Sequence, residues 1–256
     1  MDNTPSSDPF SLAGKRILVT GASSGIGRQT AIACAEMGAQ LLITARNTER
    51  LAGTLHALAG EGHQPIAADL TRAEDLAALA AQAEPLHGIV HAAGISKLVP
   101  VRMAKEAHWQ ELFAHNTFAP MLLTKELLAK RKVQAGGSIV FISAVASHVG
   151  PLASSAYSAS KGALLGAMRS LGLEVAKQSI RVNCIAPGYV RTPMLDGLAT
   201  GGLNTDDYAG LAPLGMGEPQ DVAHAAIYYL ADASRWVTRN YFIVDGGLTV
   251  PMDIYA

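Results

Sequence analysis

The chain has 256 residues, of which 49% are hydrophobic, 16% are charged and 25 are glycine. This length suits one large domain with a substantial core, and the composition is typical of a globular α/β protein rather than a disordered one. A formal net charge of -1 gives no electrostatic reason to expect binding to nucleic acid or to an anionic membrane.

Short apolar runs alternate with stretches of helical spacing along the chain. Residues 1–10 lack an apolar core and are expected to form a disordered tail before a single domain at 11–256. The expected strands are Arg16–Thr20, Leu41–Thr44, Pro65–Ala68, Gly88–His91, Ser138–Ile142, Arg181–Ile185 and Tyr241–Val244. The expected helices lie between them, at about 28–37, 49–59, 73–83, 109–130 (one or two helices), 155–177 and 219–231. This alternation predicts an open, doubly wound parallel sheet of about seven strands with helices on both faces.

Cysteine spacing and charge distribution exclude other classes. Cys34 and Cys184 lie far apart and outside any CxxC or Cys/His cluster, so two buried free thiols are expected and no metal site. Residues 133–160 contain no Lys, Arg, Asp or Glu, but glycines and serines interrupt them. A buried strand and a loop are therefore expected there rather than a membrane span. We expect a soluble, cytoplasmic protein.

A glycine-rich turn, Gly21-Ala-Ser-Ser-Gly25-Ile-Gly27, joins the first strand to the first helix. Glycines allow the backbone to turn tightly and to approach a pyrophosphate, whose charge is stabilised at a helix N-terminus. The spacing GxxxGxG differs from the usual GxGxxG, so the pattern alone does not identify a dinucleotide site. The strand and helix around it favour such a site over a turn without a ligand.

The end of the second strand indicates which dinucleotide would bind. The sequence there is Ile43-Thr-Ala-Arg46-Asn47, with no acidic residue before Glu49. A carboxylate at this place accepts a hydrogen bond from the 2′-hydroxyl of NAD, whereas a guanidinium binds the 2′-phosphate of NADP. Arg46 therefore predicts that NADP(H) is preferred and that NAD(H) is possible. The alternative is a solvated arginine with no ligand.

Tyr157 and Lys161 lie four residues apart in the longest expected helix, on the same face. A cation beside a phenol favours the phenolate and lowers a pKa that is ordinarily about 10. Tyr157 is therefore a candidate general acid or base. Taken alone, an ordinary surface pair explains this common pattern equally well.

Together, Thr20-Gly-Ala-Ser-Ser-Gly-Ile-Gly27, Tyr157-x-x-x-Lys161 and Pro187-Gly188 resemble the short-chain dehydrogenase/reductase family, in its form of about 250 residues that includes 3-oxoacyl reductases. The resemblance runs from Leu12 to about Thr249. It extends to Asp69-Leu70, Ala92-Ala93-Gly94, Asn116 and Val244-Asp-Gly-Gly247. It implies a Rossmann-type fold and an NAD(P)-dependent enzyme.

The resemblance also implies roles for individual residues. Tyr157 would give or take the proton, Ser143 would hydrogen-bond the substrate carbonyl, Lys161 would bind the nicotinamide ribose, and Asn116 would hold a water in the proton relay. Asp69 would face the adenine and Thr192 the carboxamide. The implied cofactor-binding residues are Gly21, Ser23, Ser24, Gly25, Ile26, Gly27, Arg46, Asp69, Leu70, His91, Ala93, Gly94, Tyr157, Lys161, Pro187, Gly188, Val190 and Thr192, and the substrate residues are Ser143 and Tyr157.

The chain departs from the family pattern at two positions. His91 replaces an asparagine that usually follows the fourth strand, and Arg239 stands where a glycine is common before the last strand. His91 is expected to be a satisfied buried histidine rather than a second acid. By family analogy, residues 189–214 would form a lid over the substrate, and the chain would assemble as a homotetramer or homodimer.

Three functions follow from these expectations. The leading hypothesis is NADPH-dependent reduction of a carbonyl, with a 3-oxoacyl thioester or another β-keto compound as a plausible substrate. The alternative is an NADP-dependent dehydrogenase that oxidises a secondary alcohol such as a sterol, polyol or sugar. A catalytically silent NADP sensor ranks below both, because Asn116, Ser143, Tyr157 and Lys161 are all present.

Overall fold

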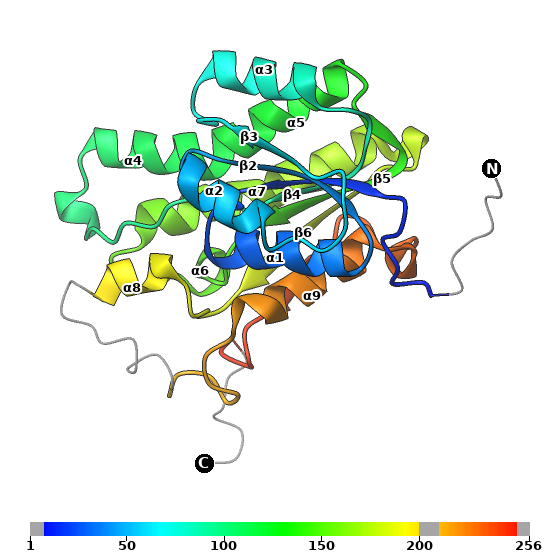
Figure 1. Ribbon diagram of the computed structural model, residues 1–256. Coiled ribbons are helices and arrows are strands. Elements are labelled where there is room, and N and C mark those ends of the chain that lie inside the picture. The colour runs from blue at the N-terminus through cyan, green and yellow to red at the C-terminus, as the bar shows by residue number, and fades with distance from the viewer. Residues whose placement is uncertain (1–7, 200–209, 250–256) are drawn as a thin grey trace.

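Figure 1 shows the computed structural model, which describes residues 8–199 and 210–249. One parallel sheet runs through the molecule in the strand order β3-β2-β1-β4-β5-β6-β7, which confirms the predicted fold class. The strands are β1 (Arg16–Thr20), β2 (Gln40–Ala45), β3 (Gln64–Ala67), β4 (Leu86–His91), β5 (Val133–Ile142), β6 (Arg181–Pro187) and β7 (Tyr241–Val244).

Helices cover both faces of the sheet (Figure 1). One layer consists of α1 (Gly25–Glu36), α2 (Thr48–Leu55) and α9 (Pro219–Leu230), and the other of α3 (Ala73–Gln82), α5 (Ala119–Ala129) and α7 (Ser155–Glu174). Helix α4 (Glu106–Phe113) packs against α7, and a π-helical turn, Ala114–Phe118, joins α4 to α5. The short helices are α6 (Ala146–Val149) and α8 (Pro193–Ala199), with 3₁₀ turns at Val101–Met103, Ala176–Gln178 and Asp232–Ser234.

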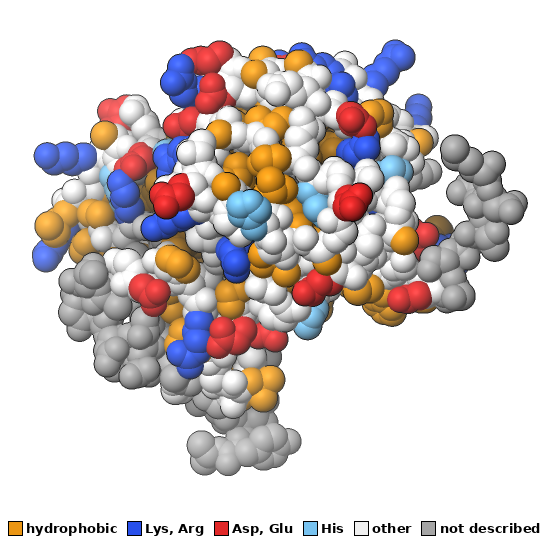
Figure 2. Space-filling model, in the orientation of Figure 1, with side chains coloured by type: hydrophobic (Ala, Val, Ile, Leu, Met, Phe, Trp, Pro, Cys, Tyr) orange, Lys and Arg blue, Asp and Glu red, His pale blue; other side chains and the backbone are white. Residues whose placement is uncertain are grey.

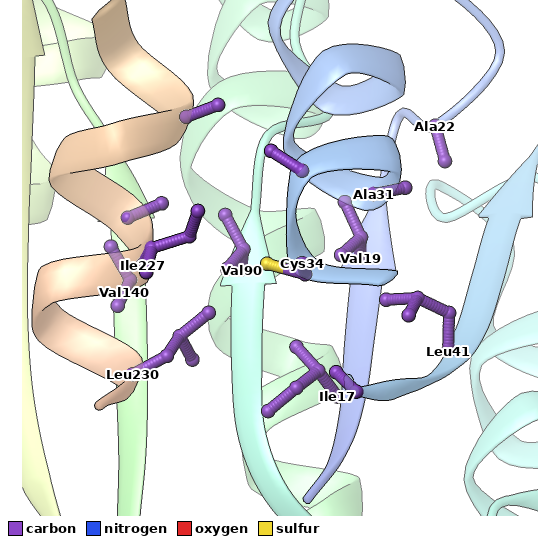
Figure 3. Close-up of a cluster of buried hydrophobic side chains, with 14 of the residues drawn as sticks. Ile17, Val19, Ala22, Ala31, Cys34, Leu41, Val90, Val140, Ile227 and Leu230 are labelled. Carbon is purple, nitrogen blue, oxygen red and sulfur yellow. The ribbon is translucent and has the colours of Figure 1, made fainter. Parts of the chain in front are cut away.

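The central strands are buried on both faces, which explains why their sequences lack apolar/polar alternation. Ile17 and Val19 of β1 point into the cluster beneath α1 and α9, whereas Leu18 joins the cluster on the opposite face. Figure 3 shows the first cluster, with Val90 and Val140 of the neighbouring strands beside Ile227 of α9. Cys34 and Cys184 are buried free thiols, as predicted, and burial raises the pKa of each to about 12.

Several boundaries differ from the sequence-based expectations. Residues 8–10 belong to the domain and not to a tail, since the Ala233 amide donates to Pro9 O (2.9 Å) and the Phe10 ring contacts Tyr228. Helix α2 ends at Leu55, before the expected residue 59. The segment expected to form one or two helices at 109–130 forms two, α4 and α5, which begin at Glu106 and are separated by the π-helical turn.

Arg239 adopts the left-handed conformation with φ of 58°, which is the backbone geometry that favours glycine. Its Nε donates to Arg169 O (2.9 Å) in α7. Its side chain crosses Gly172, where an added Cβ would lie 2.5 Å from the Arg239 Cγ. The hydrogen bond to α7 and the missing side chain at Gly172 together accommodate the arginine.

The charged side chains on the described surface agree with a net charge close to zero. Basic and acidic side chains are intermingled on the face shown in Figure 2. Among residues 8–199 and 210–249, no helix is both long and apolar enough to cross a membrane.

The sheet order places a topological switch between β1 and β4, because the chain crosses from the β3 edge back to the centre of the sheet. Loops that leave the carboxyl ends of parallel strands diverge at such a point and open a crevice. The glycine-rich turn follows β1, Ala92–Gly94 follow β4, and Ser143 follows β5. The predicted site residues therefore meet at this edge.

Candidate active site

A cavity of about 470 Å³ opens at the carboxyl ends of the strands. It is lined by all but one of the eighteen residues expected to bind the cofactor, the exception being His91. Ser143 also lines it, whereas Asn116 lies behind the wall. The cavity is thus continuous from the glycine-rich turn and Arg46 to Tyr157 and Lys161.

The glycine-rich turn is shaped by close backbone packing. Gly21 has φ of 67°, and a Cβ added there would lie 2.8 Å from Ala93 Cα. A Cβ on Gly27 would lie 2.4 Å from Gly21 O, so α1 can approach the end of β1 only with glycine at this position. The N-terminus of α1 faces the cavity without a capping side-chain bond from Ser24. These features fit the pyrophosphate of a dinucleotide.

Two arginines line the cavity near the end of β2. Arg46 follows the strand directly, and Arg50 lies one helical turn further on, where its amide is capped by Asn47 Oδ1 (2.8 Å). The Thr71 amide donates to Asp69 Oδ1 (3.0 Å), and this hydrogen bond is the largest cause of the lowered pKa of Asp69. The charge of Arg46 lowers that pKa as well. Arg50 was not predicted, although its place in the first turn of the helix after β2 could have indicated it.

Tyr157 and Lys161 lie on α7 and both line the cavity. Lys161 is only 5% exposed, and its ammonium donates to Ile142 O (2.9 Å). Burial lowers the pKa of Lys161 to about 8. Burial raises the pKa of Tyr157 to about 12, contrary to the expected lowering by Lys161. Desolvation, which disfavours the charged phenolate, is the cause of this shift.

Asn116 lies in the π-helical turn, a local irregularity that is frequent at functional sites. Its side chain accepts from the Ile95 amide (2.9 Å) and donates to Ile95 O and to Ser160 Oγ (3.0 Å each). Asn116 therefore joins the loop after β4 to α7, next to Lys161. The predicted water relay behind the lysine stays a prediction.

Ser143 is almost completely buried, with 3% exposure. Its hydroxyl donates to the carbonyl oxygen of Lys161 (3.0 Å) and lies 3.5 Å from Ser147 Oγ. No hydrogen bond joins it to Tyr157 within the described part of the chain. These contacts tie the end of β5 to α7. Ser143 lines the cavity with Tyr157, and its role in holding a substrate carbonyl stays a prediction.

His91 does not line the cavity, in contrast to its expected place among the cofactor residues. Its ring is buried, stacks on Phe141 at 5.0 Å between centroids, and contacts Thr124 Oγ1 through Nε2 (2.9 Å). The Thr124 hydroxyl donates to Pro120 O, so His91 Nε2 is the donor in this pair. Burial lowers the pKa of His91 to about 3, and the residue is a buried core histidine as expected. It is not fully satisfied, because its buried Nδ1 has no hydrogen-bond partner among the described residues.

Part of the cavity wall is apolar, and of its residues Met194 and Leu195 belong to the expected lid whereas Val149 and Leu248 were not predicted. Met194 and Leu195 of α8, Val149 of α6 and Leu248 line the same cavity as Tyr157. Part of the expected lid, 200–209, lies outside the described residues, so the lid stays a prediction.

A parallel sheet with a dinucleotide-shaped cavity at its switch point, and a tyrosine and a lysine at one end, defines a nicotinamide-dependent oxidoreductase. A family model described as enoyl-(acyl carrier protein) reductase matches residues 21–249. The 3-oxoacyl-[acyl-carrier-protein] reductase of Mus musculus is 37% identical over 236 residues, which cover 90% of this chain and 96% of that protein. The 5-keto-D-gluconate 5-reductase of Escherichia coli K12 is 32% identical, over 95% of this chain and 98% of its own.

Solved structures agree with these sequence matches. One described as a short chain dehydrogenase/reductase family protein superposes with a TM-score of 0.84 at 34% identity, over 93% of this chain and 98% of that one. The chain belongs to the short-chain dehydrogenase/reductase family. It is an oxidoreductase of the kind that uses NAD(P)(H) and acts on keto or alcohol groups.

Proposed function

We propose that the protein is an NADPH-dependent reductase that converts a carbonyl group to a secondary alcohol, with a 3-oxoacyl or other β-keto compound as substrate. The observation that carries this proposal is the protonated Tyr157 phenol in a cavity whose neighbouring wall is apolar. A phenol with a pKa of about 12 is ready to give a proton and is a poor base at neutral pH.

The residues around the cavity suit a bound dinucleotide. The glycine-rich turn would hold the pyrophosphate, Arg46 and Arg50 the 2′-phosphate, and Lys161 the nicotinamide ribose. When bound, a reduced nicotinamide supplies the hydride for the carbonyl carbon. As negative charge develops on the carbonyl oxygen, the Tyr157 hydroxyl donates its proton there, which completes the alcohol.

The walls near Tyr157 favour an apolar substrate over a sugar. Val145 and Leu195 are buried in the lining, and Val149 and Met194 expose 47% and 40% of their surface at its rim. Binding a polyol would require several hydrogen-bond donors and acceptors, because an unpaired buried hydroxyl is costly. An acyl chain would instead bury apolar surface against these side chains.

The second candidate is an NADP-dependent dehydrogenase that oxidises a secondary alcohol such as a sterol, polyol or sugar. The likeness to a ketogluconate reductase favours the substrate class of this candidate, since that relative's named substrate is of the sugar class, although its named reaction is a reduction. Oxidation would use Tyr157 as the base and reduction would use it as the acid, so the direction of turnover with NADPH and with NADP⁺ discriminates the two candidates. A silent NADP sensor is less well supported, because the phenol and the buried lysine are retained in the cavity.

We also propose that the protein forms a homotetramer or homodimer. Phe118 and Leu122, near the start of α5, are 55% and 49% exposed, and Leu173 at the end of α7 is 62% exposed. Such side chains on adjacent helices can be covered by a second copy. Light scattering during size-exclusion chromatography measures this mass directly.

The test of the proposed function is consumption of NADPH and NADH with two substrate panels. One holds β-keto thioesters, β-keto esters and diketones of increasing chain length, and the other holds 5-ketogluconate and sugar ketones. We expect turnover with NADPH on the first panel, rising with apolar chain length. Turnover confined to sugar ketones would keep the reductase and change its substrate class, whereas turnover seen only as alcohol oxidation with NADP⁺ would move the assignment to the second candidate. Tight NADPH binding with no turnover in either direction would support the sensor.

A further inference from the structure

A row of three hydroxyl groups leads from the cavity wall into the protein. Ser143 lines the cavity, whereas Ser147 of α6 and Tyr241 of β7 lie outside its lining. The Ser147 Oγ lies 3.5 Å from the Ser143 Oγ and 3.1 Å from the Tyr241 hydroxyl. No role in the site was predicted for Ser147 or Tyr241, because neither belongs to the motifs of the family pattern.

The acceptors around this row determine where its protons point. Ser143 donates to Lys161 O (3.0 Å), and Ser147 donates to Ala144 O (2.7 Å). Each hydroxyl has one proton, so Tyr241 is the donor in its pair with Ser147. Burial raises the pKa of Tyr241, which keeps this hydroxyl protonated and able to donate. Ser143 and Ser147 then face each other through lone pairs, which agrees with their separation of 3.5 Å.

The two carbonyl oxygens that accept from the serines have other partners as well. Ala144 O also accepts from the Ser147 amide (3.0 Å) and lies 3.4 Å from the Tyr241 hydroxyl. Lys161 O lies inside α7, where the helix itself provides an amide donor. Both serine hydroxyls can therefore turn to new acceptors without leaving a buried carbonyl unpaired, which would be costly.

The backbone that carries the two serines is held by β6 and α7. The Ser143 amide donates to Ile185 O (2.7 Å). A Cβ on Gly162 would lie 3.7 Å from the Ser147 Cβ, so α6 packs closely against the helix that carries Tyr157. Small side-chain rotations, rather than a movement of the backbone, are enough to turn the row of hydroxyls toward the cavity.

We propose that Ser147 and Tyr241 are positioning residues that act through Ser143 when Ser143 holds the substrate carbonyl. This inference rests on the proposed function and on the predicted role of Ser143. With substrate bound, Ser143 donates to the carbonyl oxygen, Ser147 turns to donate to Ser143 Oγ, and Tyr241 continues to donate to Ser147 Oγ. Hydrogen bonds that run in one direction polarise one another, so the Ser143 hydroxyl becomes a stronger donor to the oxygen where negative charge develops.

The experiment compares Tyr241→Phe, Ser147→Ala, Ser143→Ala and the double variant Ser143→Ala/Tyr241→Phe with the wild type, using NADPH and the best ketone of the panel. Tyr241→Phe and Ser147→Ala should each lower kcat about three- to tenfold, the range expected for one neutral hydrogen bond, with an unchanged Kd for NADPH. Ser143→Ala should lower kcat about 10²-fold. In the Ser143→Ala background, Tyr241→Phe should have no further effect on kcat, because the residue through which Tyr241 acts has lost its hydroxyl.

Tyr229→Phe is the matched control, because the Tyr229 hydroxyl also donates within the protein, to Asn240 Oδ1, and Tyr229 lies outside the cavity lining. It should lower the melting temperature and leave kcat at the wild-type value.

Three outcomes would overturn the inference. One is wild-type kcat in Tyr241→Phe, or in Ser147→Ala if Tyr241→Phe does not fold. Another is an equal fold loss from Tyr241→Phe with and without the Ser143 hydroxyl, which would show a structural effect that does not pass through Ser143. The third is wild-type kcat in Ser143→Ala, which would leave the reductase assignment intact. The proposed function fails separately, and this inference with it, if the wild type reduces no ketone of either panel.

Discussion

Replacing Arg46 tests the cofactor preference. Arg46 is exposed at the end of β2, and its guanidinium lines the cavity together with that of Arg50. A hydrogen bond to a charged group contributes about 1.5–3 kcal/mol, and solvent screening at this exposed site favours the lower end. Since 1.4 kcal/mol is about tenfold in affinity, Arg46→Ala should raise the Kd of NADPH about 10-fold. The Kd of NADH should change by less than about twofold, because NADH has no 2′-phosphate.

The assay is titration of nicotinamide fluorescence with each cofactor, at low and at high salt. The difference between Arg46→Ala and the wild type should shrink at high salt, because exposed charges are screened. Arg235→Ala is a matched control, since Arg235 is also exposed but does not line the cavity. An equal loss of NADPH and NADH affinity, or no change in either, would refute the reasoning. Arg50→Ala shows whether the second guanidinium shares the phosphate.

Three further predictions concern pH and packing. Because burial lowers the pKa of Lys161 to about 8, the ammonium loses its proton above pH 8 and kcat/KM for ketone reduction should fall there. A kcat/KM that stays constant from pH 7 to 10 would contradict this. Burial lowers the pKa of His91 from 6.5 to about 3, so the unfolded chain takes up a proton below pH 6.5 and the folded protein loses stability as the pH falls. Urea unfolding should show a loss of about 2 kcal/mol between pH 6.5 and 5. His91→Asn should remove this dependence on pH. Gly27→Ala should destabilise the protein by about 2–3 kcal/mol, because the added Cβ would collide with Gly21 O. Gly53→Ala is the matched control in a helix, and it should not destabilise the protein because the space around Gly53 is open.

The sequence predicted most of the sheet because its strands are short apolar runs between turn residues. The expected bounds of β1 and β7 match the structure, and β6 extends two residues past Ile185 into Pro187. The segment at residues 109–130 was less predictable, since a π-helical turn preserves an apolar pattern while it shifts the backbone. The end of α2 also depends on tertiary packing rather than on a local stop signal.

Site residues were predictable by type and position but not by contact. Motif spacing placed Tyr157, Lys161, Asp69 and Thr192 at one cavity. It could not show that the Ser143 hydroxyl binds Lys161 O, because that bond depends on how β5 meets α7. Nor could it reveal the raised pKa of Tyr157, which results from the burial of the whole pocket rather than from its neighbour in the helix.

The role of Tyr157 as the proton donor is tested most directly by Tyr157→Phe, which removes one hydroxyl and leaves the ring in α7. Tyr228→Phe is the matched control, because Tyr228 lies in α9 and outside the cavity lining. We expect Tyr157→Phe to bind NADPH as the wild type does and to reduce the best ketone with a kcat lower by about 10²–10⁴-fold, while Tyr228→Phe stays fully active. Ketone reduction by Tyr157→Phe at the wild-type rate would contradict the account.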